Sequence, residues 1–82
     1  MEAYDEFIEM IVKKLVDYPE DVKVTQVDSE KTIILELEVN NDDLGKVIGK
    51  NGRTAKAMRT LLTASAAKNG SRKARLEIVE DD

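Results

Sequence analysis

The stretch GKVIGKNGR, residues Gly45–Arg53, decides how the rest of this 82-residue chain is interpreted. It combines three glycines with three basic side chains, in a protein whose net charge is −4. Gly49 can end a helix with a positive φ, and Gly52 lacks a Cβ that would keep another molecule away from the backbone. We therefore expect GKNG to form a tight, exposed connection between two helices, with Lys50 and Asn51 at its tip.

Helical patterns flank this connection on both sides. Before it, NNDDLGKVIG (residues 40–49) begins with Asn and Asp residues that favour a helix start, and Leu44, Val47 and Ile48 form one apolar side. After it, a longer helix is predicted over residues 53–68. One arc of the longer helix is expected to be buried, and it consists of Ala55, Met58, Leu61, Leu62, Ser65 and Ala66.

A further helix and three strands are predicted in the rest of the chain. Residues 2–17 carry apolar side chains at spacings of three and four, which is typical of a helix packed on a core, and Pro19 ends it. Residues 21–27 and 32–39 alternate apolar and polar side chains around the polar turn DSEK and form a predicted hairpin. The last strand is predicted at residues 73–79.

The predicted order of elements is helix, strand, strand, helix, helix, strand. Because the last strand follows a helical crossover, it should lie parallel to residues 32–39. Strands with one apolar face place all the helices on that face. The sequence therefore predicts an α+β fold, a two-layer sandwich with a three-stranded mixed sheet and helices on one face. A chain of this length is expected to form one domain, residues 1–82, with Asp81–Asp82 as a short acidic tail.

Charge is divided unevenly along the sequence. Nine basic residues and no acidic one lie between Lys46 and Arg75, so this segment carries +9. The remaining four basic and 17 acidic residues leave the rest of the chain at −13. An unbroken basic block in an acidic protein points to an anionic ligand, although a solvated helix face without a ligand would have the same composition.

Composition also argues against several classes of function. The chain has no cysteine and no histidine, which removes thiol nucleophiles, histidine bases and the common zinc sites. The acidic start MEAYDEFIEM lacks the basic head and apolar run of a signal peptide. No apolar stretch approaches the roughly 20 residues of a membrane span. We expect a cytoplasmic protein with no enzymatic activity, metal, cofactor or membrane contact.

The GKNG connection has the properties of a loop that binds a nucleic-acid backbone. The helix after it begins with unpaired N–H groups and the positive end of the helix dipole, which suit a phosphate, and Lys50 and Arg53 add cationic donors. A Walker A loop does not fit, because only three residues separate Gly45 from Gly49 and because Asn51 follows Lys50. A capped turn without a ligand is the alternative, since two glycines in four residues are common.

The elements around the loop make the pattern more specific. VIGKNG lies between two helices, with a strand before the pair and another after it. In this the sequence resembles the KH family of RNA-binding domains, whose GxxG loop clamps a nucleic-acid backbone. The N-terminal helix and strand resemble the type II, prokaryotic arrangement, and nearly the whole chain resembles the small single-KH proteins of many bacteria. One departure is Ala55, where KH domains usually have a larger aliphatic residue.

The resemblance implies a groove bounded by the first of the two helices, the GKNG loop, the start of the second helix and the last strand. Ile48 and Ala55 would form part of an apolar floor, although either residue could instead belong to the core. Arg75 would either reach the ligand or pair with Glu36 or Glu38 across the sheet. The residues expected to contact RNA are Lys46, Ile48, Gly49, Lys50, Asn51, Gly52, Arg53, Lys56, Arg59 and Arg75.

The resemblance also implies a function and partners. The chain would bind single-stranded RNA of about four nucleotides per groove, and would act as a post-transcriptional regulator or RNA chaperone that influences the cell envelope and division. It would form a homodimer and pair with a larger KH-containing protein of the KhpB or Jag type. A function of another class is a dimerisation or scaffold module whose glycine loop contacts protein, which the acidic strands slightly favour because they repel RNA.

Overall fold

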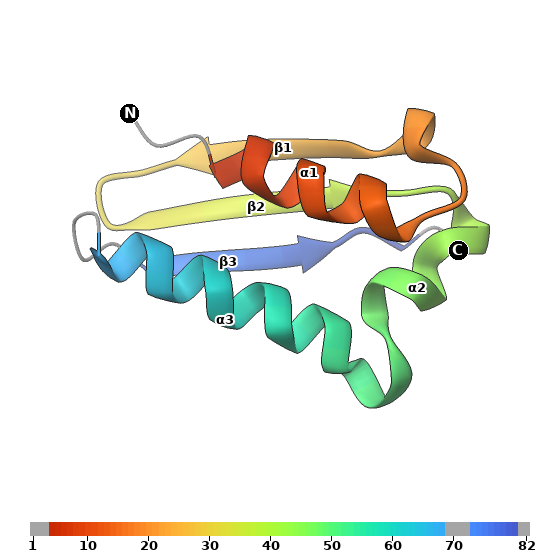
Figure 1. The fold of residues 1–82 in the computed structure, drawn as a ribbon. Coiled ribbons are helices and arrows are strands. Elements are labelled where there is room, and N and C mark those ends of the chain that lie inside the picture. Colours follow the sequence, from red (N-terminus) through yellow and green to blue (C-terminus); the bar gives the residue numbers. More distant parts are fainter. Residues whose placement is uncertain (1–3, 69–72, 81–82) are drawn as a thin grey trace.

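The computed structural model describes residues 4–68 and 73–80 and confirms the predicted order of elements (Figure 1). Three short 3-10 turns, η1 to η3, connect the larger elements. The helices and strands are α1 (Tyr4–Leu15), β1 (Lys23–Asp28), β2 (Thr32–Glu38), α2 (Leu44–Ile48), α3 (Arg53–Lys68) and β3 (Lys73–Ile78), and the turns are η1 (Pro19–Asp21), η2 (Asn41–Asp43) and η3 (Lys50–Gly52). Within the described ranges, no helix has the length and apolar character needed to cross a membrane.

The sheet has the strand order β1-β2-β3. β1 pairs with β2 in antiparallel register, with Lys23 opposite Glu38, and β3 pairs with β2 in parallel, with Lys73 opposite Thr32. The predicted hairpin and the mixed sheet are therefore confirmed. Figure 1 shows α1 beside β1 and β2 and α3 along β3, and both helices contribute side chains to one buried cluster with the strands, so the fold is the predicted two-layer α+β sandwich.

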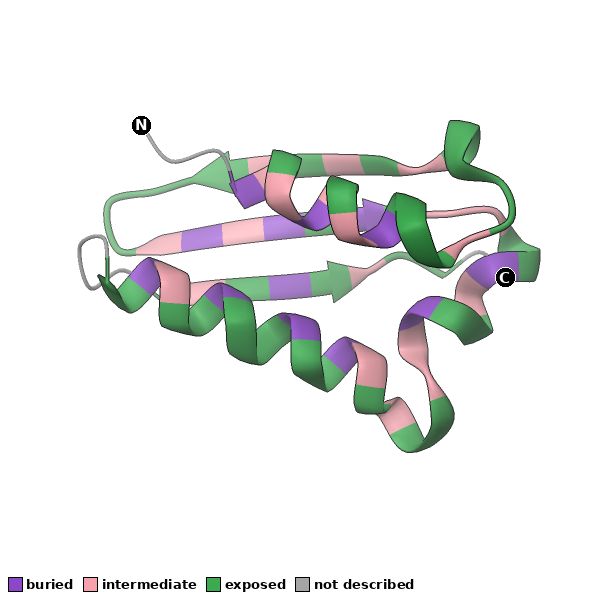
Figure 2. Cartoon of the chain, viewed as in Figure 1, coloured by how far each residue is buried: buried purple, intermediate pink, exposed green. Residues whose placement is uncertain are grey.

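The core lies between this face of the sheet and the helices. The central strand β2 contributes alternate residues, Ile33, Leu35 and Leu37, and the buried sides of α1 and α3 face them (Figure 2). Alternation with a period of two on the strand and three or four on the helices is the pattern from which the fold was predicted. The buried cluster comprises Tyr4, Ile8, Val12, Ile33, Leu35, Leu37, Val47, Met58, Leu62, Ala66 and Leu76.

The buried side of α3 is narrower than predicted. Its buried residues are Ala55, Met58, Leu62 and Ala66, whereas Leu61, which was expected in the same arc, is 49% exposed. Successive helical residues are turned by about 100°, so Leu61 cannot share the sheet-facing stripe centred on Leu62. In the described part of the chain no element covers the outer side of α3, and Leu61 remains on the surface.

Helix α1 ends two residues earlier than predicted, at Leu15 rather than Asp17. The backbone N–H groups of Asp17 and Tyr18 donate to the Asp43 side chain instead of continuing the helix. Pro19 then opens the turn η1. Two other predicted features lie outside the described residues: the helix start at Glu2 and the acidic tail Asp81–Asp82.

Helix α2, the turn η3 and the first turns of α3 form an arm that extends away from the sheet at the end near the C-terminus of α1 (Figure 1). The predicted Asn cap is present before the arm, because the Asn40 side chain accepts a hydrogen bond from the N–H of Asp42 and caps η2, but the α-helix itself begins only at Leu44. The GKNG segment lies at the tip of this arm. The fold therefore presents the glycine loop to solvent on a support of two helices.

Candidate nucleic-acid interface

The GKNG loop combines three residues with positive φ. Gly49 has φ 80° and ψ 168°, Asn51 has φ 58° and ψ 27°, and Gly52 has φ 73°. The predicted positive φ at Gly49 is confirmed, but its ψ is extended, and the left-handed helical conformation is adopted by Asn51 instead. Asn tolerates this conformation better than most residues do. The result is a tight reversal between α2 and α3.

The two loop glycines are needed for different reasons. A Cβ on Gly49 would lie 2.7 Å from the backbone nitrogen of Thr54 and would also collide with the Thr54 side chain. A Cβ on Gly52 would meet no atom within 4 Å. Gly49 is therefore packed against the start of α3, whereas the space beside Gly52 is open to a molecule that approaches the backbone.

The start of α3 offers fewer free donors than the sequence suggested. The N–H of Gly52 donates to the Gly49 carbonyl at 3.0 Å, and the N–H of Arg53 donates to the Lys50 carbonyl, so the turn η3 uses both groups. A phosphate at this end must consequently depend more on side-chain cations than on a ring of backbone donors.

Three cations lie on the loop and the start of α3. Lys50, Arg53 and Lys56 are all exposed, and within residues 4–68 and 73–80 no carboxylate forms an ion pair with them. Lys50 is on the loop, while Arg53 and Lys56 are one turn apart on α3. The structure therefore places three available positive charges along the loop and the first turn of α3.

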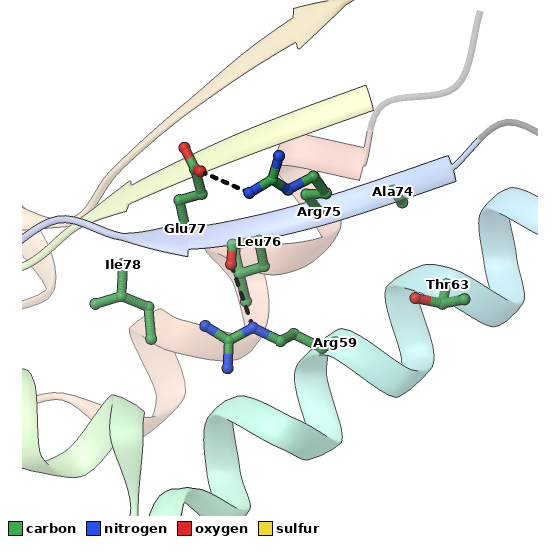
Figure 3. A pocket seen from close by; sticks show the side chains of 7 residues that line it. All are labelled: Arg59, Thr63, Ala74, Arg75, Leu76, Glu77 and Ile78. Carbon is green, nitrogen blue, oxygen red and sulfur yellow. Dashed lines mark hydrogen bonds and ion pairs between the residues drawn. The ribbon is translucent and has the colours of Figure 1, made fainter. Parts of the chain in front are cut away.

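A cleft of about 500 Å³ lies between α3 and the edge strand β3 (Figure 3). Arg59 and Thr63 line it from α3, and the strand residues 74–78 line it from the other side. The Arg59 Nε donates to the Leu76 carbonyl at 3.2 Å, which bridges the helix and the strand. Figure 3 shows the two terminal nitrogens of Arg59 beyond this bond, on the side of Ile78. Arg59 and the last strand were predicted to belong to the groove, whereas Thr63 and the outward Leu76 carbonyl were not.

The strand backbone at this cleft is the free edge of the sheet. The N–H groups of Lys73 and Val79 donate to carbonyls on the β2 side, those of Lys31 and Leu37. Backbone groups alternate in direction along a strand, so Leu76 points its carbonyl outward, where Arg59 meets it. This alternation of backbone direction along the last strand was the signal that would have indicated the outward Leu76 carbonyl at the cleft.

Arg75 does not make the contact that was expected across the sheet. Its side chain lies on the opposite side of β3 from Arg59 (Figure 3), and its ion pair is with Glu77 on the same strand, at 3.4 Å. The expected pairing with Glu36 or Glu38 is therefore wrong. Arg75 and Glu77 are two residues apart on one strand, so their side chains lie on the same face of the sheet and can pair with each other.

The two apolar residues expected in a groove floor differ in access. Ile48, at the end of α2, is half-buried and is not part of the buried cluster. Ala55 is only 3% exposed, so a ligand cannot rest on it as expected. Ile48 remains accessible as an apolar surface beside the loop, and Ala55 belongs to the buried side of α3.

Lys46 is oriented toward the end of α1. Its Nζ lies 3.1 Å from Asp17 Oδ2 and 3.8 Å from Asp43 Oδ1. The hydrogen bond to the Asp17 carboxylate, with the charge of that group, raises the pKa of Lys46 above its usual 10.5. Among the ten residues predicted to contact RNA, Lys46 is thus already engaged by two carboxylates.

The chain folds as a type II KH domain. An N-terminal helix is followed by a β-hairpin, then by two helices joined by a GxxG loop, and finally by a strand that lies parallel to the central strand of the sheet. The family model described as KhpA/KhpB, KH domain, matches residues 5–78, and the chain belongs to this family.

Similar proteins match the chain over nearly its full length. "RNA-binding protein KhpA" of Aquifex aeolicus is 49% identical over 80 residues, which are 98% of this chain and 100% of the relative. The protein of the same name from Clostridium perfringens is 54% identical and covers 90% of this chain and 97% of its own length, and that from Listeria monocytogenes is 50% identical, with 93% and 99%. These relatives are named as RNA-binding proteins, which agrees with the prediction that the chain is not an enzyme.

The fold also matches a solved structure of a larger protein. The crystal structure of Aquifex aeolicus Era bound to GDP.AlF4- superposes with a TM-score of 0.67 at 18% identity. The match covers 90% of this chain and 28% of the Era chain. At this identity the likeness concerns the fold alone.

Proposed function

We propose that this chain is a non-catalytic protein that binds single-stranded RNA in the cytoplasm, with residues 1–82 acting as one KH domain. The observation that carries the proposal is a set of three exposed cations, Lys50, Arg53 and Lys56, that have no ion-pair partner among the described residues and lie beside a loop that is open at Gly52. The names of the relatives support it, since they are RNA-binding proteins.

Each part of the arm has a separate role in this proposal. Lys50, Arg53 and Lys56 meet the phosphates of about four nucleotides, and Gly52 lets the RNA backbone come close. Ile48 provides an apolar surface beside the loop, and the cleft at Arg59 receives a base. The terminal nitrogens of Arg59 are donors only, so they discriminate between bases by the acceptors that a base presents.

Neither Arg75 nor Lys46 is retained as a direct contact. The Arg75 side chain lies on the opposite side of β3 from Arg59 and pairs with Glu77, and Lys46 pairs with Asp17 and Asp43. In the described part of the chain only α1 residues supply aromatic rings inside the core, and none lies on the arm. Base stacking on aromatic side chains consequently contributes little, and binding should depend strongly on salt.

A matched pair of lysine substitutions tests the proposal. Lys50→Asp and Lys31→Asp each change the charge by the same amount at an exposed turn, but only Lys50 lies in GKNG. We expect Lys50→Asp to weaken binding to a labelled RNA oligonucleotide by about tenfold or more, because a phosphate contact becomes a repulsion, while Lys31→Asp stays within about twofold. Circular dichroism should show both variants folded. Equal losses for the two variants would reduce the loop to a connection without a ligand.

A second function, dimerisation, is favoured by the outer side of α3. Leu61 is 49% exposed and lines a shallow depression with Ala57, Thr60 and the two cations Arg53 and Lys56, and a second depression follows along the helix at Ala64. The small side chains of Ala57 and Thr60 beside Leu61 let a second helix approach closely. We propose that a second copy of this chain packs there, with a larger KH-containing protein of the KhpB or Jag type as the competing partner.

The cellular role that we propose is post-transcriptional. The protein would act as an RNA chaperone or regulator whose targets affect the cell envelope and cell division. Crosslinking the protein to RNA in cells and sequencing the attached fragments tests this directly. Recovery of transcripts with no enrichment for envelope or division genes would refute the cellular role without affecting RNA binding. Loss of dimerisation with unchanged RNA binding after loop substitution would instead support the scaffold alternative.

A further inference from the structure

Asp43 is the fully buried charged side chain of the described residues, with an exposed fraction of 0%. It is the last residue of η2 and directly precedes α2, where an aspartate ordinarily caps the helix that follows. Its side chain makes no capping hydrogen bond to α2. Burial of a carboxylate is unfavourable unless the group is hydrogen-bonded or paired, so the partners of Asp43 outside its own helix indicate what it does.

These partners belong to the segment that follows α1. Asp43 Oδ1 accepts from the N–H of Asp17 and Oδ2 accepts from the N–H of Tyr18, both at 3.0 Å. Lys46 Nζ lies 3.8 Å from Asp43 Oδ1 and 3.1 Å from Asp17 Oδ2. We call Asp17, Asp43 and Lys46 the arm latch. It joins the end of α1 to the beginning of the arm that carries GKNG.

Apart from the packing of Gly49 against Thr54, helix α2 buries little of its own surface. Helix α2 has five residues, and Val47 is its one buried residue. Burial of one side chain is not directional, whereas the two hydrogen bonds at Asp43 are directed and help to fix the orientation of α2. The orientation of α2 in turn sets where Gly49 and Lys50 lie relative to β3.

We propose that the arm latch positions the GKNG loop for RNA, and that Lys46 serves the latch and is not a phosphate contact. Asp43 and Lys46 are thus positioning residues that act through the arm. The inference rests on the proposed RNA binding and adds to it the residues that hold the groove in place. It also reassigns one of the cations that the sequence suggested for RNA.

Asp43→Asn is the sharpest perturbation of the latch. An amide presents one acceptor and one donor where two N–H donors converge, so one of the two hydrogen bonds must be lost. Asp42→Asn is the matched control, because Asp42 is the exposed neighbour and undergoes the same change in charge. In fluorescence anisotropy with a labelled single-stranded RNA, we expect Asp43→Asn to bind about fivefold more weakly or worse at every salt concentration, and Asp42→Asn to bind at least as well as the unmodified chain.

Salt dependence separates a positioning lysine from a phosphate contact. Lys50→Gln should reduce the slope of log affinity against log salt by about 0.7, the value for one phosphate. Lys46→Gln should weaken binding with the slope unchanged, and Lys46→Arg should restore affinity. A drop in slope for Lys46→Gln equal to that for Lys50→Gln would overturn the assignment. Because Lys46 is exposed, this pair of variants stays informative even if Asp43→Asn does not fold.

Amide hydrogen exchange distinguishes failure of this inference from failure of the proposed function. In folded Asp43→Asn, the amides of Asp17, Tyr18 and Gly49–Gly52 should exchange faster, with the strand amides unchanged. A lower melting temperature with normal loop exchange and normal RNA affinity would overturn the positioning role. If the unmodified chain binds no RNA, the proposed function fails, and loop exchange alone then supports or refutes the latch.

Discussion

Replacement of Gly49 by alanine should destabilise the protein far more than the same replacement at Gly52. Gly49 has φ 80° and ψ 168°, in a region that is essentially restricted to glycine and costs other residues about 1–3 kcal/mol. A Cβ there would also lie 2.7 Å from the Thr54 backbone nitrogen, so the main chain itself must move. The free energy of unfolding should therefore fall by about 3 kcal/mol or more.

The other two described glycines provide graded controls. Gly52 has φ 73° but open space around the position of a Cβ, so alanine there meets only the left-handed conformation, at about 1–2 kcal/mol. Loss of freedom in the unfolded chain offsets about 0.4–1 kcal/mol of this, which leaves a net loss of about 1 kcal/mol. Gly45 lies inside α2 with nothing within 4 Å, and alanine should stabilise that helix by about 0.5–1 kcal/mol.

Urea denaturation followed by circular dichroism measures the three free energies of unfolding. A domain of this size changes its melting temperature by about 4–8 °C per kcal/mol, so the order Gly45→Ala, unmodified chain, Gly52→Ala, Gly49→Ala should also appear in thermal scans. Equal losses at Gly49 and Gly52, or a larger loss at Gly52, would refute the reasoning from the Thr54 contact. A loss at Gly45 would show that α2 is packed more tightly than its open surroundings indicate.

Affinity for single-stranded RNA should fall with log salt at a slope of about −2, from about 0.7 for each of Lys50, Arg53 and Lys56; a slope near zero in anisotropy titrations would exclude them as the docking surface. Leu61→Asp should convert a dimer into a monomer in light scattering with little change in melting temperature, and a variant that remains dimeric would rule out the outer side of α3. Arg59→Lys should retain the charge but lose the planar donors, so affinities for RNAs of different sequence should converge; unchanged preferences would leave Arg59 with only its bridge to β3.

Much of the fold follows from local patterns in the sequence. The periods of three to four and of two located every helix and strand, and residues 53–68 were placed with the bounds that the structure has. These patterns are reliable here because a small domain has a single core, and each element must turn its apolar side toward it. The glycine loop was predictable for a similar reason, since positive φ values restrict which residues a tight turn accepts.

Patterns within one element could not show how wide its buried face is. Leu61 and Leu62 are both leucines in the same helix, and only the position of the sheet decides that Leu62 is buried and Leu61 is exposed. The end of α1 was misplaced for a related reason. The N–H groups after Leu15 donate to the side chain of Asp43, a residue about 26 positions away, and a helical pattern contains no information about such an acceptor.

The sequence by itself determined the order of the elements, the glycine turn and the concentration of positive charge around it, because each depends on residues near one another in the chain, and the mixed sheet followed from the helical crossover between β2 and β3. Only the tertiary structure decided which of those cations are available. Lys50, Arg53 and Lys56 have no carboxylate partner in the described residues, Lys46 is held by Asp17 at 3.1 Å, and Arg59 is bonded to β3. An ion pair depends on distance in space, and residues far apart in sequence come within that distance only when the chain has folded.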